Sequence, residues 1–102
     1  MIRHIVLTKF SPETDEQTIA AIYEGLAALV DRLPGAGGFT GGRSQSPEQI
    51  ERGYMHGFTI DFDTWDALEV YADHSEHKQL GARLVASAIG GKEGILVVDW
   101  EV

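Results

Sequence analysis

Residues 54–62 read YMHGFTIDF, and their alternation decides the predicted fold. One face would carry Tyr54, His56, Phe58, Ile60 and Phe62, and the other would carry the remaining four residues. A period of two is typical of a β-strand that buries one face. We therefore predict a central strand here, with its aromatic face toward the core.

The segment before this strand contains a second strong pattern. Residues 2–10 (IRHIVLTKF) are rich in β-branched residues and predict a strand whose centre is apolar on both faces. Thr14 lies three residues before Gln17, the spacing of a capping box, so we place a helix start there. Apolar residues at helical spacing follow from Ile19 to Leu33, and the pair Pro34-Gly35 ends the helix.

The remaining elements complete a recognisable order. A poorly marked strand is expected at 39–44, and Asp63 or Thr64 is expected to cap a short helix carrying Tyr71. A break at 73–75 separates it from a second helix with His77, and a final strand spans 95–102. The order β-α-β-β-α(α)-β predicts a ferredoxin-like α+β fold, a four-stranded antiparallel sheet with helices on one face. We assign residues 1–102 to one domain.

One face of this sheet would lack a covering layer. It would carry Ile5 and Leu7 with part of the apolar run 95–98. An exposed apolar patch of that extent indicates an interface, and a second copy related by a two-fold axis would cover it. We predict a homodimer through this open sheet face.

Composition excludes several classes of function. The 102 residues include 16 acidic and 8 basic side chains, a net charge of −8, and no cysteine. Clustered basic residues are what nucleic acids and anionic membranes require, so neither is expected as a partner. The absence of cysteine excludes disulfides and thiolate chemistry and is compatible with the cytoplasm, where we expect the protein.

The four histidines are the candidates for chemistry. Tyr71, His74 and His77 form a Y-x-x-H-x-x-H element where the two C-terminal helices meet, and His4 and His56 lie on the two predicted central strands. His77 falls in the first turn of its helix, where the macrodipole disfavours the charged ring. A neutral, inward-facing imidazole can act as a general base, and Tyr71 can orient it or stabilise a developing enolate with His4.

Simpler roles compete with this interpretation. His4 and His56 can be hydrogen-bonded core residues, and His74 can satisfy backbone groups at the helix junction. A metal site is disfavoured because His74 and His77 are three residues apart, without the H-E-x-x-H pattern and without cysteine. We predict no metal and no other cofactor.

Taken together, the first strand with His4, the strand with His56 and the sequence YADHSEH at 71–77 resemble the stress-responsive dimeric A/B barrel (Dabb) family over the whole chain. The resemblance implies a ferredoxin-like protomer whose sheet closes a dimeric α/β barrel. The chain is also similar to polyketide cyclases of the olivetolic acid cyclase type, which implies His77 as general base with Tyr71 as its partner. Ser75 stands where the family commonly has proline.

The expected function is therefore that of a homodimer with a small apolar pocket for a small apolar or carbonyl ligand. The alternative is a cofactor-independent enzyme of the cyclase, aldol or lyase type, with His77, Tyr71 and His4 as its catalytic residues. A third possibility is a monooxygenase of the antibiotic-biosynthesis type, with Trp65 and Trp100 stacking on substrate. The side chains expected to line the pocket as ligand contacts are His56, His74, Val6, Thr8 and Phe58.

Overall fold

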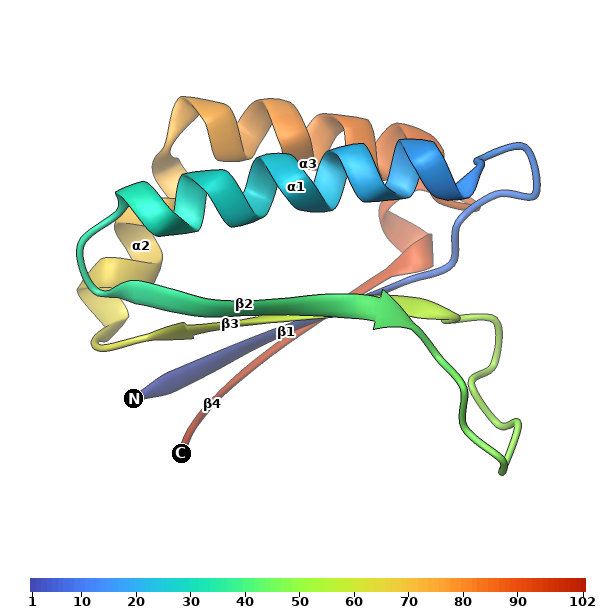
Figure 1. Cartoon of the computed structure of the whole chain (residues 1–102), viewed down its shortest axis with the longest axis horizontal. Coiled ribbons are helices and arrows are strands. Elements are labelled where there is room, and N and C mark those ends of the chain that lie inside the picture. Colours follow the sequence, from blue (N-terminus) through green and yellow to red (C-terminus); the bar gives the residue numbers. More distant parts are fainter.

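Two layers build the structure, a four-stranded antiparallel sheet and a layer of helices on one of its faces (Figure 1). The computed structural model describes residues 1–102. Along the chain the elements are β1 (Ile2–Thr8), α1 (Glu16–Arg32), β2 (Ala36–Arg43), β3 (His56–Phe62), α2 (Trp65–Asp73), α3 (Ser75–Ser87), the 3₁₀ helix η1 (Gly91–Gly94) and β4 (Ile95–Glu101). The predicted ferredoxin-like α+β fold is confirmed.

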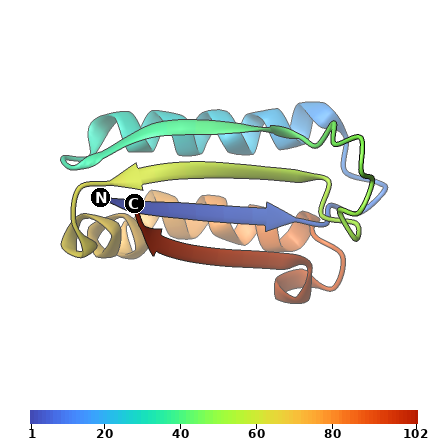
Figure 2. The same cartoon turned by 90° about the horizontal axis from the view of Figure 1, so that it is seen from below.

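The sheet has the order β2-β3-β1-β4, so β1 and β3 are its central pair (Figure 2). Val6 lies opposite Phe58 on β3 and opposite Val97 on β4. Side chains of a strand alternate between the two faces of a sheet. The even-numbered residues of β1 and β3 consequently face the helices, as the alternation at 54–62 predicts.

The core lies between this face and α1. Ile22, Leu29 and Val30 of α1 are fully buried, as are Ile60 and Phe62 of β3. The apolar spacing of α1 puts one stripe of the helix on the sheet, and burial of such a stripe is the main source of helix stability in a folded protein.

The predicted helix start at Thr14 is wrong. Asp15 is the N-cap of α1, and its carboxylate accepts a hydrogen bond from the Thr18 amide at 2.8 Å. The Thr14 hydroxyl instead donates to the carbonyl oxygen of Ser87, at 3.2 Å. Aspartate and threonine are both good N-cap residues, so spacing alone misplaced the cap by one position.

The strand boundaries also differ from the prediction. β3 begins at His56 and not at Tyr54, whose ring lies under the ammonium group of Lys9, at 4.8 Å from ring centroid to nitrogen. Left-handed φ angles at Gln49, Arg52 and Gly53 bend the preceding loop away from the sheet. β2 starts at Ala36, three residues earlier than expected, and β1 ends at Thr8.

The sheet face away from the helices is uncovered in the protomer. On it, Leu7 lies opposite Leu96 and Ile5 opposite Val98, with Trp100 further along β4. Leu96 and Val98 are each 44% exposed and Trp100 is 52% exposed. The loop between β2 and β3 extends on this same side of the sheet (Figure 1). We call this surface the open sheet face.

None of the helices combines the length and hydropathy that crossing a membrane requires.

Candidate functional site

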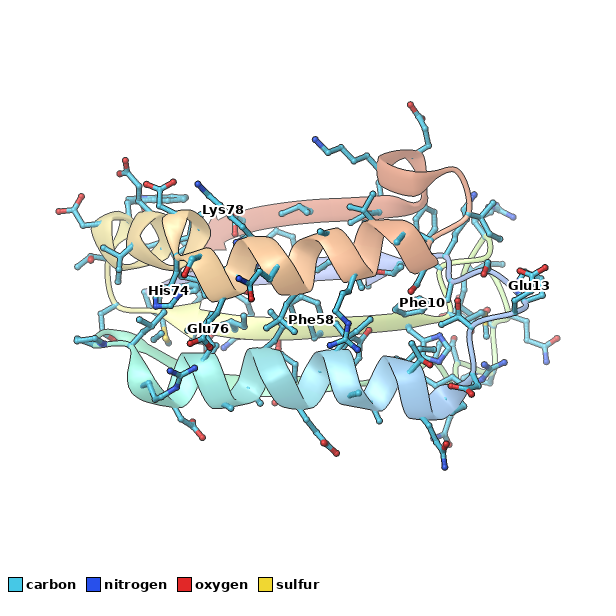
Figure 3. The ribbon with its side chains drawn as sticks, turned by 90° about the horizontal axis from the view of Figure 1, so that it is seen from above. Phe10, Glu13, Phe58, His74, Glu76 and Lys78 are labelled. Atoms are coloured by element: carbon cyan, nitrogen blue, oxygen red, sulfur yellow. The ribbon has the colours of Figure 1, made fainter.

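A cavity of about 910 Å³ lies between α3 and the β1–β4 half of the sheet. Apolar side chains dominate its wall, 11 of 16 lining residues being hydrophobic. We call it the α3–β4 cavity. It exists because α1 and α3 pack side by side above the sheet, so that no helix lies outside α3 to cover the edge strand β4 (Figures 2 and 3). The predicted site residues on its wall are His4, Val6, Phe58, Tyr71 and His77.

His77 is held in a defined tautomer. Its Nδ1 lies 3.0 Å from the carbonyl oxygen of Ala72, and a carbonyl can only accept, so Nδ1 carries the proton. The neutral ring therefore has its lone pair on Nε2. Burial lowers the pKa of His77, and the nearby His4, His74 and Lys78 lower it further, against the opposing hydrogen bond to Ala72. The ring is consequently a neutral acceptor at neutral pH, which a general base must be.

Tyr71 brings a hydroxyl next to this base. Its ring centroid is 4.4 Å from that of His77, and its side chain is almost completely buried. The hydroxyl has no hydrogen-bond partner in the protein, and burial raises the pKa of Tyr71 above its usual value. A neutral phenol without a partner retains its capacity to donate a hydrogen bond.

His4 is oriented by a carboxylate. Its Nδ1 lies 2.6 Å from Oδ1 of Asp99 on β4, directly across the strand pair. Nδ1 therefore donates to Asp99, and the lone pair of the neutral ring is on Nε2. The ring packs edge-on against Tyr71, at 5.9 Å between centroids. His4, Tyr71 and His77 thus form one contiguous group on the cavity wall.

His56 does not join this group. It shares the inner face of the sheet with His4, but it pairs with Thr8 in register whereas His4 pairs with Ile60, so the two histidines lie four residues apart along the strand pair. Its Nε2 contacts Glu16 in the first turn of α1 at 3.1 Å. His56 therefore ties the start of β3 to α1, a structural role.

Thr8 and His74 also lie outside the α3–β4 cavity. Thr8 is fully buried next to the end of β1, opposite His56. His74 is the N-cap of α3, where its Nδ1 accepts a hydrogen bond from the Glu76 amide at 3.1 Å. Both residues were predicted to contact a ligand, and the structure places them elsewhere.

Two other kinds of site, a metal site and stacking tryptophans, have no matching arrangement of side chains in the structure. No three histidine, aspartate or glutamate side chains come close enough together to hold a metal ion. Trp65 is half-exposed on α2 with its indole nitrogen donating to Glu101, and Trp100 lies on the open sheet face. Neither tryptophan reaches the cavity, so neither can stack on a molecule bound there.

Sequence reasoning missed three contributors to this site. Asp99 is ninety-five residues from its partner His4, and only the strand register joins them. The carbonyl of Ala72 is a backbone group that no side-chain pattern identifies. The flank of α3 with Lys78 and Ala82, which no sequence pattern singled out, forms one wall of the cavity.

Comparisons with known proteins agree with the fold. The Dabb family, described as the stress-responsive A/B barrel domain, matches residues 2–102. The stress-response A/B barrel domain-containing protein HS1 of Arabidopsis thaliana is 25% identical over 100 residues, which cover 98% of this chain and 88% of HS1.

Solved structures extend the likeness to three dimensions. A dimeric ferredoxin-like protein of unknown function from Jannaschia sp. CCS1 is 37% identical, with a TM-score of 0.93 over 99% of this chain and 98% of that one. A hydroxynitrile lyase from Passiflora edulis is 16% identical, with a TM-score of 0.85 over 99% and 92% of the two chains, and at that identity it shows the fold alone. The family match spans all secondary-structure elements, and the chain belongs to the stress-responsive A/B barrel (Dabb) family.

Proposed function

We propose that the protein acts as a homodimer in which the α3–β4 cavity of each protomer binds a small, largely apolar molecule that carries a carbonyl or hydroxyl oxygen. The observation behind this proposal is the Tyr71 hydroxyl, buried and without a partner on the wall of the cavity. A buried polar group without a hydrogen bond costs about 1–3 kcal/mol. A ligand oxygen that accepts a hydrogen bond from Tyr71 would recover that free energy. The unpaired hydroxyl therefore favours the binding of such a ligand.

The dimensions and lining of the cavity support a ligand of this kind. A volume of about 910 Å³ lies within the usual range for small-molecule sites. Val6, Phe58, Leu84 and Val97 supply apolar wall, while Tyr71 and His77, whose side chains carry polar atoms, lie toward the start of α3. Most of the ligand would therefore be hydrocarbon, with its oxygen at the Tyr71–His77 end.

The open sheet face supports the proposed dimer. Leu7, Leu96, Val98 and Trp100 remain substantially exposed in the protomer, and such a contiguous apolar surface favours burial against another protein. The similar Jannaschia protein is dimeric, which favours a second copy of this chain as the covering layer.

Titration with 2-octanone tests cavity binding. We expect its NMR shift changes to cluster at His4, Tyr71 and Val97, and we expect Ala82→Trp, which fills the cavity from α3, to abolish them. Ala21→Trp is the matched control, because Ala21 is exposed on α1 and does not line the cavity. Shift changes that persist in Ala82→Trp, or that cluster elsewhere, would overturn the proposal.

A second candidate function is proton transfer within the same cavity, favoured by the fixed tautomer of His77. The base would be Nε2, whose lone pair takes an activated proton from the carbon next to a carbonyl. The electron pair of the broken C–H bond passes to the carbonyl oxygen, where the Tyr71 hydroxyl donates to the enolate. Return of the proton from His77 restores the ketone.

Exchange of these protons in D₂O tests catalysis without requiring the natural substrate. If His77 is the base, the protein accelerates deuterium uptake at the carbons beside the carbonyl of 2-octanone, and His77→Gln loses most of the acceleration. His56→Gln is the control, because His56 lies outside the cavity. Equal exchange rates for the wild type and His77→Gln would exclude this function and leave binding intact.

A further inference from the structure

Apart from the carboxylate of Asp99, which is hydrogen-bonded to His4, the charged side chains at the α3–β4 cavity are basic. Lys78 and Lys92 lie on its wall together with His4 and His77, and none of the 16 lining residues is acidic. The chain as a whole has twice as many acidic as basic residues. The two lysines therefore make this wall opposite in sign to the net charge of the molecule.

An acidic and a basic side chain lie on different sides of α3. Glu76 turns toward α1, where Arg32 donates to it, whereas Lys78 projects on the other side of the helix, away from α1 and toward β4 (Figure 3). Arg3, Arg32 and Arg43 each pair with a carboxylate. Neither Lys78 nor Lys92 takes part in an ion pair, so both ammonium groups are available to an anion.

The two lysines lie near opposite ends of the cavity. Lys78 follows His77 directly at the polar end, and Lys92 lies in η1, just before Ile95. On the floor between them, β4 runs from Asp99 beside His4, past Val97 beside Val6, to Ile95 beside Thr8. Four residues of extended strand correspond to about 13 Å. The cavity is thus an apolar channel with a polar group at each end.

We propose that the natural ligand is an amphipathic carboxylate, with its carbonyl or hydroxyl oxygen at Tyr71 and its carboxylate paired with Lys92. This inference rests on the proposed function and adds the chemical class of the ligand. Lys92 is the partner because it lies at the end of the cavity away from Tyr71 and His77, where the far end of an extended ligand would lie. An anion at the η1 end leaves the neutral imidazole undisturbed.

A matched pair of probes separates the carboxylate from the rest of the ligand. 7-Oxooctanoate and 2-octanone share the methyl ketone and the chain length, and differ only in a terminal carboxylate or methyl group. An exposed ion pair contributes up to about 1 kcal/mol, so calorimetry should show the acid binding about fivefold more tightly at low salt. Screening at high salt should reduce this advantage.

Lysine variants test which residue is responsible for the tighter binding of the carboxylate. Lys92→Met should remove the preference, so that 7-oxooctanoate and 2-octanone bind this variant with similar affinity. Lys9→Met is the control, because it changes the net charge equally and Lys9 does not line the cavity. Lys78→Met should retain the preference for the acid.

The outcomes distinguish this inference from the function it rests on. If the acid and the ketone bind the wild type equally, or if Lys9→Met or Lys78→Met removes the preference as Lys92→Met does, the assignment to Lys92 is overturned while cavity binding stands. If neither probe binds, or if Ala82→Trp leaves binding unchanged, the proposed function itself fails and this inference fails with it.

Discussion

The Nδ1 atom of His77 donates a hydrogen bond to the carbonyl oxygen of Ala72, five residues earlier in the chain. Ala72 lies in the last turn of α2, where carbonyl groups lack partners within the helix. The extended backbone of His74 ends α2 and starts α3, so His77 folds back onto that free carbonyl. The helix break therefore orients the imidazole and fixes the lone pair of the neutral ring on Nε2.

Acidification should destabilise the protein partly through His77. Its pKa is lowered in the folded state, so between that pKa and the unfolded value of about 6.5 the unfolded chain binds more protons. The contribution of His77 to stability is complete above about pH 6.5 and is lost as pH falls through the folded pKa. The urea midpoint of the wild type should drop more between about pH 7.5 and about pH 5 than that of His77→Gln. An equal drop in both proteins would contradict the lowered pKa.

Tyr71→Phe should separate binding from stability. The substitution removes a buried hydroxyl that has no partner, so the free energy of unfolding should change by less than about 1 kcal/mol or increase. Affinity for 2-octanone should fall about five- to tenfold, because the ligand loses one hydrogen bond. Urea unfolding and calorimetry on the same protein measure the two effects.

Tyr23→Phe is the matched control for this variant. The hydroxyl of Tyr23 is also buried and unpartnered, but Tyr23 packs against Phe39 and Phe58 and does not line the cavity. We expect a similarly small change in stability and no change in affinity. Loss of affinity in both variants would show that the effect is indirect.

Local patterns sufficed to predict the elements and the core of this fold. The alternation at 54–62 and the helical spacing of α1 report burial directly, because each face of a strand or helix meets either core or solvent. His77 and Tyr71 were found for the same reason, since their spacing puts them on either side of one helix junction.

Contacts between distant segments were beyond local reasoning. His4 and His56 share a face, yet only the register of β1 on β3 shows that they lie four residues apart along it. The same holds for Asp99, which β4 brings to His4, and for the cavity, which depends on where α3 sits above the sheet. Spacing within one element carries no information on these relationships.

Gly57→Ala should destabilise the sheet. A β-carbon at Gly57 would lie 2.6 Å from Cδ2 of Leu7 and 2.8 Å from the carbonyl oxygen of Val6, and the backbone atom cannot move without breaking the β1–β3 pairing. Overpacking of this kind costs about 1–3 kcal/mol. Gly42→Ala is the control, because its β-carbon would meet nothing within 4 Å. Urea unfolding should show a clear loss for Gly57→Ala only, and equal losses would indicate a general effect of removing glycine from the sheet.

Val98→Asp should separate the proposed dimer into protomers. Val98 lies opposite Ile5 on the open sheet face, where a carboxylate would have to be buried without a partner when a second copy covers that face. Val70→Asp is the control, because Val70 is 56% exposed on α2, on the helical side of the sheet. Sedimentation velocity should give a dimer for the wild type and Val70→Asp, and a monomer for Val98→Asp that retains its helical circular dichroism. A dimer that survives Val98→Asp would place the interface on another surface of the protein.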